Sequence, residues 1–185
     1  NSCVDNDQIE NVSTTGGSTN ISNPASGCSF TGYGDFTALT PVTLNPSDLF
    51  TLDVTPQGTY DEGYSDWIDW NNDDDFVDAG EQVGYVIVAT GWSNQFTFTV
   101  PATAAIGTHT MRCRISYQPD DGAIVPCGDT QWGEVEDYSV VIQAAPTGVL
   151  TLACGSNQTI VASQKGTRMP NVTSTATAST TCAGG

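Results

Sequence analysis

Apolar residues alternate with polar ones over short stretches of this chain, and turn-forming residues separate the stretches. Phe50, Leu52 and Val54 fall on one side of such a stretch, and Phe96 and Phe98 on one side of another. No helical periodicity of useful length appears, and β-branched and aromatic residues dominate the apolar set. The predicted strands occupy residues 9–14, 36–43, 49–55, 64–70, 82–89, 94–100, 108–117 and 136–143.

This pattern predicts an all-β fold. Short strands with turn residues every ten positions or so are typical of an antiparallel β-sandwich, either Ig-like or jelly-roll-like. The chain of 185 residues is long enough for one well-buried domain. We place this domain at residues 1–145.

The composition changes after Ala145. Residues 146–185 contain no Asp or Glu, two basic residues and many Thr and Ser. Residues 149–153 and 159–162 can form strands, whereas residues 173–181 are of low complexity. We predict a separate C-terminal extension, either a small disulfide-linked unit or a strand donated to the sheet edge of a neighbouring molecule.

The charge and the apolar runs exclude several classes of partner. A formal net charge of −17 argues against nucleic acid and anionic membranes. No apolar run approaches the roughly 18 residues that a membrane span needs. No signal-peptide pattern stands at Asn1, so we expect a mature secreted chain.

The chain has six cysteines and few lysines, which indicates an oxidising compartment. Their spacing is not that of a zinc site, since no Cys-x-x-Cys occurs and His109 is the single histidine. Proximity in the sequence predicts the pairs Cys3–Cys28, Cys113–Cys127 and Cys154–Cys182. The alternative is that some of them are buried free thiols.

The densest acidic segment lies between Asp69 and Glu81. Oxygen-bearing side chains recur there at every second position, and two more follow; the candidate ligands are Asp69, Asn71, Asp73, Asp75, Asp78 and Glu81. No Lys or Arg precedes Arg112, so these carboxylates have no local counter-ion and would repel one another. Ca²⁺ accepts several oxygens from a single short loop. We therefore predict a Ca²⁺ loop.

The flanks of this segment read as strands, so we expect the loop to connect a β-hairpin and not two helices. In an EF-hand the closing Glu stands at position twelve, where this loop has Gly80 and Glu81 follows. Asp74 stands at position six, where a glycine is usual. Asp tolerates a positive φ better than most residues, so the turn can still form.

A second group of charges is formed by Glu134, Glu136 and Asp137, at the start of a strand-like run. Either these carboxylates complete the calcium shell from across the sandwich, or they form a salt link to Arg112 or Arg114. The two arginines alternate with apolar residues, so both point to one side of their strand. A third reading is a solvated strand end.

Catalysis finds little support in these residues. His109 lies in a strand-like run without a nucleophile elbow, and the glycines form no phosphate-binding pattern. A pair of carboxylates could hydrolyse a glycoside, but with 21 of them a pair carries no specificity. We expect no catalytic residues.

Several stretches together resemble the GEVED domain of secreted bacterial proteins. They are Trp67-Ile68-Asp69-Trp70-Asn71 with Asp73, Asp75, Phe76 and Gly80-Glu81, Val100-Pro101-Ala102-Thr103-Ala104 with Gly107, Met111-Arg112 with Arg114, Cys127-Gly128, and Gly133-Glu134-Val135-Glu136-Asp137-Tyr138. The resemblance spans residues 3–143 and implies a non-catalytic β-sandwich accessory domain of a surface protein. Asp74 departs from its usual glycine. Cys113, at an apolar strand position, departs as well and suggests a disulfide to Cys127.

Two functions remain open. The first is a calcium-stabilised structural domain of a bacterial surface assembly, such as a filament, adhesin or sheath, with self-association or other surface proteins as partners. The second is a binding module of a secreted hydrolase for carbohydrate or protein, with Trp92, Trp132 and Tyr117 as a platform for glycans. The direction of these aromatic side chains distinguishes the two: an exposed row indicates a binder and an inward cluster a scaffold.

Overall fold

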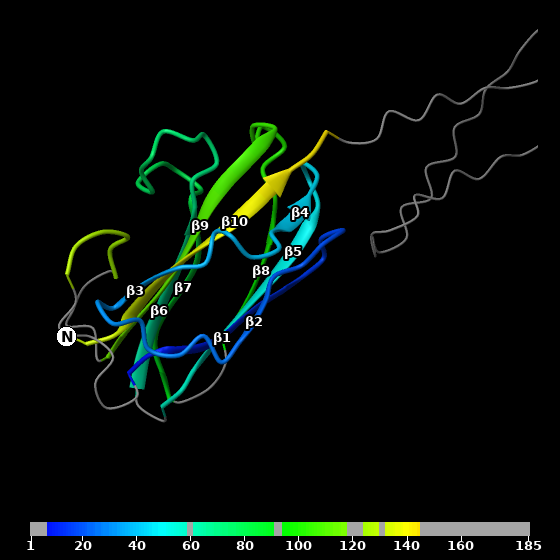
Figure 1. Ribbon diagram of the computed structural model, residues 1–185. Coiled ribbons are helices and arrows are strands. Elements are labelled where there is room, and N and C mark those ends of the chain that lie inside the picture. Colours follow the sequence, from blue (N-terminus) through cyan, green and yellow to red (C-terminus); the bar gives the residue numbers. More distant parts are fainter. Residues whose placement is uncertain (1–6, 59–60, 91–93, 118–123, 130–131, 145–185) are drawn as a thin grey trace, which may run out of the picture.

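The computed structural model describes residues 7–58, 61–90, 94–117, 124–129 and 132–144. Ten strands and no helix occur in this part of the chain, and the strands form two packed sheets (Figure 1). No helix that could cross a membrane occurs among these residues. The predicted all-β sandwich is confirmed.

The first sheet has four strands in the order β2-β1-β5-β8. Their bounds are Ser22–Pro24 for β2, Ile9–Thr15 for β1, Leu49–Pro56 for β5 and Asn94–Thr99 for β8. The neighbouring pairs, β1 with β2, β1 with β5 and β5 with β8, are all antiparallel. Strands β2 and β8 form the two edges of this sheet.

The second sheet has six strands, with β3-β10-β9-β6-β7 in order and β4 also paired to β10. Their bounds are Tyr33–Asp35 for β3, Glu134–Ile142 for β10, Gly107–Tyr117 for β9, Asp61–Ile68 for β6, Gln82–Thr90 for β7 and Val42–Leu44 for β4. The short strands β3 and β4 pair with successive parts of β10 in parallel, whereas the other pairs are antiparallel.

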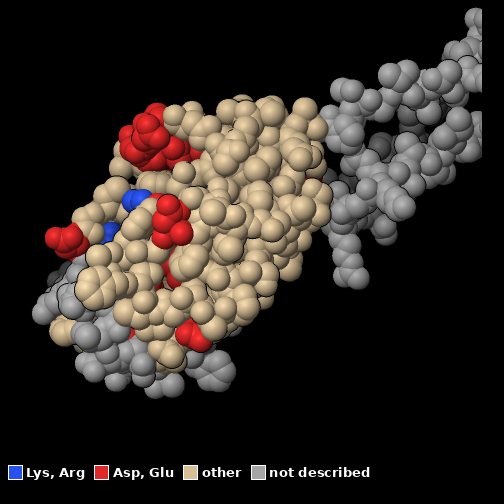
Figure 2. All heavy atoms as spheres, viewed as in Figure 1, with Lys and Arg blue, Asp and Glu red and all other residues tan. Residues whose placement is uncertain are grey.

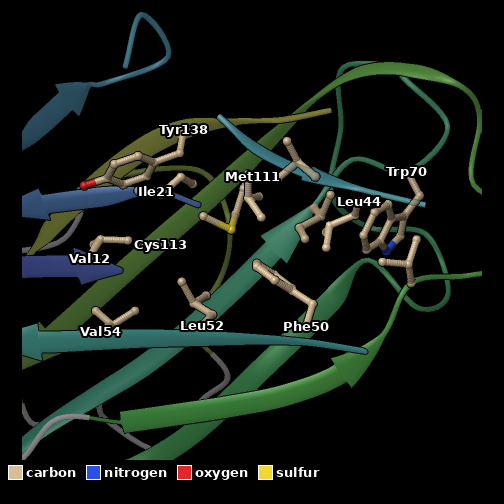
Figure 3. Packing of buried hydrophobic residues seen from close by; sticks show 14 of the residues in the cluster. Val12, Ile21, Leu44, Phe50, Leu52, Val54, Trp70, Met111, Cys113 and Tyr138 are labelled. Atoms are coloured by element: carbon tan, nitrogen blue, oxygen red, sulfur yellow. The ribbon is translucent and has the colours of Figure 1, made fainter. Parts of the chain in front are cut away.

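The core lies between the two sheets. Phe50, Leu52 and Val54 of β5 are fully buried and point toward Met111 and the other inward residues of the second sheet (Figure 3). Because side chains alternate along a strand, the polar residues between them face outward. The predicted shared face of β5 is therefore confirmed.

One predicted strand is wrong. Residues 36–41 form a turn between β3 and β4, not part of a single strand over 36–43. The Asp35 carboxylate accepts hydrogen bonds from the backbone N–H and the hydroxyl of Thr37 at 3.0 and 2.6 Å, which stabilises the turn. Phe36 follows β3 and stacks on the Tyr138 ring at 5.5 Å between centroids. The predicted strands at 149–153 and 159–162 lie outside the described residues.

Candidate metal centre and charged clusters

The acidic segment connects the antiparallel strands β6 and β7, as predicted for a hairpin loop. Both of its ends are fixed by backbone hydrogen bonds. Ile68 N donates to Glu81 O at 2.9 Å, and Asp69 N donates to Thr110 O of β9 at 3.0 Å. The Nδ1 atom of the buried His109 ring also lies 2.8 Å from Asp69 O. The loop therefore begins and ends at rigid positions of the sheet.

Within the loop, the side chains of Asn71, Asp73 and Asp75 each accept a hydrogen bond from the backbone N–H two residues further on. Asn71 Oδ1 accepts from Asp73 N at 3.0 Å, Asp73 Oδ1 from Asp75 N at 3.2 Å, and Asp75 Oδ1 from Val77 N at 3.0 Å. Such Asx turns are a local property of Asp and Asn. The alternation of Asp and Asn in the sequence thus winds the loop into successive tight turns.

Two non-glycine residues of the loop have a positive φ. Asn72 has a φ of 59° and Asp74 a φ of 68°, and Gly80 follows at 94°. Asn and Asp occupy this region more readily than other side chains. The expectation that Asp74 can replace a glycine at the sharp turn is confirmed.

Three carboxylates converge at the base of the loop. Ligand oxygens of Asp69, Asp73 and Glu81 all lie within 4.8 Å of one another. Asp69 and Glu81 are 4% and 2% exposed, whereas Asp73 is open to solvent. This geometry gives a half-enclosed group of oxygens with one open side, which suits a hard cation such as Ca²⁺.

The other predicted ligands lie around this group. The Asn71 Nδ2 amide donates to Asp73 Oδ2 at 3.0 Å and to Asp78 Oδ2 at 2.6 Å, so it links these two carboxylates. Asp75 is exposed, and its Oδ1 accepts only the backbone N–H of Val77 among the described residues. The loop thus has three converging oxygens, an amide-linked pair beside them, and Asp75 outside the group.

Backbone N–H groups, not cationic side chains, surround the buried carboxylates. Asp69 accepts from Asn72 N at 2.6 Å and Asp74 N at 3.2 Å, and Glu81 accepts from Trp70 N at 3.1 Å and Asp78 N at 3.2 Å. Burial raises the pKa of Glu81, and these two N–H groups lower it, while the charges of Asp69 and Asp78 raise it. The negative charge of the group is thus only partly compensated by the protein.

Phe76 anchors the loop on the outer face of the second sheet. It packs in a small buried cluster with Trp67 and Ile124, and the Arg112 guanidinium carbon lies 4.8 Å from its ring centroid. Figure 2 shows the dense acidic group on the surface where Figure 1 places the loop between β6 and β7. The loop is therefore in contact with Arg112 of β9.

The carboxylates of the second group, Glu134, Glu136 and Asp137, lie on opposite faces of β10. Arg112 and Asp137 are direct partners in the β9–β10 register, and their side chains form a bidentate pair with Nε–Oδ1 and Nη2–Oδ2 distances of 2.8 and 2.7 Å. Tyr33 donates its hydroxyl to the same carboxylate at 2.9 Å. The salt link that the sequence offered as one alternative is formed by this pair.

Glu134 and Glu136 point the other way, into the space between the sheets. Glu134 accepts hydrogen bonds from Ile9 N at 2.9 Å and from Ser29 N at 2.7 Å, which joins β10 to β1 and to the turn before β3. Glu136 accepts the hydroxyl of Tyr138 at 2.6 Å. The alternative that these two glutamates complete the calcium shell is wrong. Both point into the space between the sheets, on the opposite side of β10 from Asp137, and they bond Ile9, Ser29 and Tyr138.

Arg114 forms no ion pair with a described carboxylate. Its Nη1 and Nη2 donate to the backbone carbonyls of Val125 and Gly128 at 2.6 and 2.9 Å. Arg112 Nη1 donates in the same way to Pro126 O at 3.1 Å. The two arginines point to one side of β9, as predicted, and they hold residues 125–128 against the sheet.

Gly133 makes the close approach of β10 to β9 possible. It has a φ of 121°, and a Cβ at this position would lie 2.1 Å from Ile115 O. A side chain there would be strained and would push the strands apart. The first residue of the Gly-Glu-Val-Glu-Asp sequence is thus fixed by backbone geometry.

A row of titratable groups crosses the inner face of the second sheet. Asp66 of β6 is opposite Cys113 of β9, which is opposite Glu136 of β10. All three are buried, and no described Lys or Arg contacts them. In the sequence, the one sign of this row is that Asp66 shares the face of its strand with the apolar residues Tyr64 and Ile68.

Burial raises the pKa of these carboxyl groups because the ionised form loses its hydration. The pKa of Asp66 rises to about 7, with a smaller opposing effect of the Cys113 thiol. Burial also raises the pKa of Glu136 to about 7, against the hydrogen bonds from Tyr138 and Ser26. Burial and then the neighbouring Asp7 carboxyl raise the pKa of Glu62 to about 9. At neutral pH the Glu62 carboxyl is therefore mostly protonated, and Asp66 and Glu136 are only partly ionised.

The predicted disulfide Cys113–Cys127 is wrong, since both thiols are free. Cys113 is buried in the core, whereas Cys127 is exposed and lies 3.5 Å from Arg112 Nη1 on the outer face. Arg112 and Cys113 are consecutive in a strand, so their side chains point to opposite faces. The alternative of a buried free thiol holds for Cys113.

The other cysteine pairs stay predictions. Cys28 is disulfide-bonded, but its predicted partner Cys3 lies outside the described residues, as do Cys154 and Cys182. Of the aromatic residues proposed as a platform, Trp132 is 37% exposed, Tyr117 is half-buried and Trp92 lies outside the described residues.

These features define a class of protein: a two-sheet β-sandwich with an acidic hairpin loop and an arginine–aspartate pair on its outer face. The sequence model of the GEVED domain matches residues 63–141, from β6 to β10. The resemblance seen in the sequence is thus confirmed over this span, which is a β-sandwich accessory domain. No curated protein matches the chain significantly.

The two free thiols should differ in reactivity. We expect iodoacetamide to modify Cys127 in the native protein, because it is exposed, and to modify Cys113 only after unfolding, because it is buried. Peptide mapping by mass spectrometry before and after denaturation measures this difference. A peptide pair joined through Cys113 and Cys127 would contradict the structure.

The buried carboxyl row should make stability depend on pH. The pKa of Asp66 is raised on folding, so its contribution to stability is fully present below the unfolded value of 3.8 and is lost as the pH rises through about 7. We expect Asp66→Asn, which stays neutral, to be more stable relative to the wild type at pH 8 than at pH 5 by about 1 kcal/mol or more.

Urea unfolding of both proteins at the two pH values, with EDTA present throughout, measures this difference. Asp53→Asn is the matched control, since this residue is only half-buried on the outward side of β5. Equal effects of Asp66→Asn at pH 5 and pH 8 would show that Asp66 is ionised in the folded protein.

Proposed function

We propose that this chain is a non-catalytic extracellular module whose sandwich is stabilised by Ca²⁺ at the loop between β6 and β7. The convergence of Asp69, Asp73 and Glu81 within 4.8 Å carries the proposal. Two of these carboxylates are almost fully buried, where mutual repulsion is poorly screened by water. A dication at the open side of the group would remove this repulsion and join the two ends of the loop.

The surrounding residues support an oxygen-binding cation rather than a softer metal. The converging side chains are all carboxylates, and the buried His109 has both ring nitrogens 2.8 Å from backbone carbonyl oxygens. Cys113 and Cys127 lie on other parts of β9 and its following segment. Carboxylate and carbonyl oxygens favour Ca²⁺, Mg²⁺ or Mn²⁺, and the loose, half-open geometry favours Ca²⁺.

A structural role also fits the titratable groups. The carboxylate of Glu134 accepts backbone hydrogen bonds, Glu136 accepts the hydroxyl of Tyr138, and His109 is 1% exposed. Such hydrogen bonds join elements of the fold: Glu134 of β10 joins the two sheets by accepting from Ile9 N of β1, for example. We infer that they serve the fold and not a reaction.

We further propose that the module is a building block of a bacterial surface assembly and associates with other copies or other surface proteins. The strands β8 and β7 are the last strands of their sheets in the described order, and such edges accept an added strand through backbone hydrogen bonds. Residues 146–185 carry no carboxylate and many Thr, so charge repulsion does not oppose their approach to an acidic neighbour.

Removal of calcium should lower the stability of the folded protein. A ligand that binds only the folded form stabilises it by about 2.7 kcal/mol when present at about 100 times its dissociation constant. We expect a fall in melting temperature when EDTA replaces Ca²⁺, measured by scanning calorimetry. Mg²⁺ at equal concentration should restore less, because it requires a smaller and more regular shell.

Two variants locate this effect. Glu81→Gln should abolish most of the difference between Ca²⁺ and EDTA, whereas Asp75→Asn, in the same loop but outside the converging group, should keep most of it. An identical melting temperature of the wild-type protein in Ca²⁺ and EDTA would exclude the cation site.

Deletion of residues 146–185 should abolish self-association if the extension donates a strand. We expect the full chain to form oligomers or filaments and the truncated chain to be a monomer, as measured by size-exclusion chromatography with light scattering and by electron microscopy. The cation site stays in both proteins, so its effect on melting temperature serves as the control for folding. Monomers in both cases would contradict the assembly proposal.

A further inference from the structure

A cavity of about 430 Å³ lies on the outer face of the second sheet, and no residue of the acidic loop lines it. Its walls come from the turn before β3 and Tyr33, from Arg112 and Arg114 of β9, from residues 126–129 and from the start of β10. Figure 2 shows the blue arginine atoms on this face, with red carboxylate atoms beside them.

Two arginines line this cavity together with the carboxylate of Asp129. Arg112 and Arg114 are the only basic residues in the described part of a chain with net charge −17, and both line the cavity. The charge of Arg112 is matched by Asp137 at 2.7 Å, but Arg114 has no carboxylate within ion-pair distance among the described residues. The cavity wall therefore contains one guanidinium without an anionic partner.

Arg114 is also 2% exposed, so this charge is held away from bulk water. Its Nη atoms donate to two backbone carbonyls, but its buried Nε–H has no acceptor among the described residues. Burial and the charge of Arg112 lower the pKa of Arg114, which shows that both oppose its cationic form. A negative charge in the cavity would favour the cationic form of Arg114 and so oppose both effects.

Several exposed apolar residues line the cavity or stand close in the chain to residues that line it. Tyr33 lines it and is 45% exposed, Phe30 precedes the lining residue Thr31 and is 95% exposed, and Val125 precedes the lining residue Pro126 and is 54% exposed. Trp132, three residues before the lining residue Val135, is 37% exposed. Aromatic side chains beside a charged cavity favour a ligand that has a ring or apolar face as well as a negative group.

We propose that this cavity is a binding site for a carboxylate-bearing small ligand, with a sugar acid as the class that fits its size and its aromatic surroundings. A carboxylate is preferred because its planar pair of oxygens matches a guanidinium. The carboxylate lies against Arg114, and the ring faces the side of Tyr33. No residue of the cation loop lines this cavity, so the binding of glucuronate and the effect of Ca²⁺ on melting temperature test the two proposals separately.

The test uses the full chain with glucuronate as the probe and glucose as the matched neutral sugar. Isothermal titration measures affinity, and the fluorescence of the tryptophans gives a second signal. We expect glucuronate to bind and glucose to bind at least about tenfold more weakly. Added salt should weaken the binding of glucuronate because the interaction is between charges.

Three surface variants place the site while leaving the core intact. Val125→Asp puts a carboxylate beside Arg114 and should weaken glucuronate binding about tenfold. Ile106→Asp is its matched control, since Ile106 is 59% exposed and lies in the turn before β9, and it should leave binding unchanged. Asp129→Asn removes a negative charge from the cavity wall and should strengthen binding.

Arg114→Gln should abolish binding, with circular dichroism and melting temperature as checks that the variant folds. If it does not fold, the Val125→Asp and Asp129→Asn variants still decide the question, because both residues are exposed. The proposal is overturned if glucuronate does not bind, if glucose binds equally well, or if Val125→Asp and Ile106→Asp have the same effect.

Discussion

The structure depends on how it neutralises negative charge with very few cations. The chain has 21 Asp and Glu against four Lys and Arg, and only Arg112 and Arg114 lie in the described part. A buried carboxylate can be stabilised by backbone N–H groups, by a bound proton, by a guanidinium or by a metal ion. Each of these solutions occupies its own region: N–H groups at Glu134, protons along the row with Asp66, a guanidinium at Asp137, and the converging oxygens of the loop, which suit a cation.

This division explains why the short sequence from Gly133 to Tyr138 has its particular residues. Gly133 allows the close approach to β9, and the two glutamates point inward, where Glu134 joins the two sheets through Ile9 N and Glu136 accepts the hydroxyl of Tyr138 on its own strand. Asp137 points outward to hold Arg112, which in turn holds residues 125–128. Because the pattern alternates, a shift of register by one residue would exchange the inward and outward groups and would leave every one of these charges without its partner.

Much of the architecture could be predicted from alternation alone, as with the buried face of β5, whereas three-residue strands such as β3 and β4 carry too few positions to show a period. The acidic loop could be found from its composition, but only the Asx turns of the folded loop bring Asp73 to Asp69 and leave Asp75 outside. The disulfide prediction failed because proximity in sequence ignores the face of the strand: Cys113 points inward and Cys127 lies outside. The same parity would have placed Glu134 and Glu136 in the core, against the general preference of charged residues for the surface.

Phe76 has a consequence for communication across the molecule. Its ring belongs to the acidic loop, packs on Trp67 and touches the Arg112 guanidinium. The position of this aromatic ring thus depends on the loop that carries it, and the ring contacts Arg112, which lines the cavity. If a cation bound in the loop shifted this ring, the affinity of the arginine wall for an anion would change with it, and by linkage the anion would change the affinity for the cation by the same free energy. One aromatic side chain would then let the divalent-cation content of the medium influence recognition on a different surface.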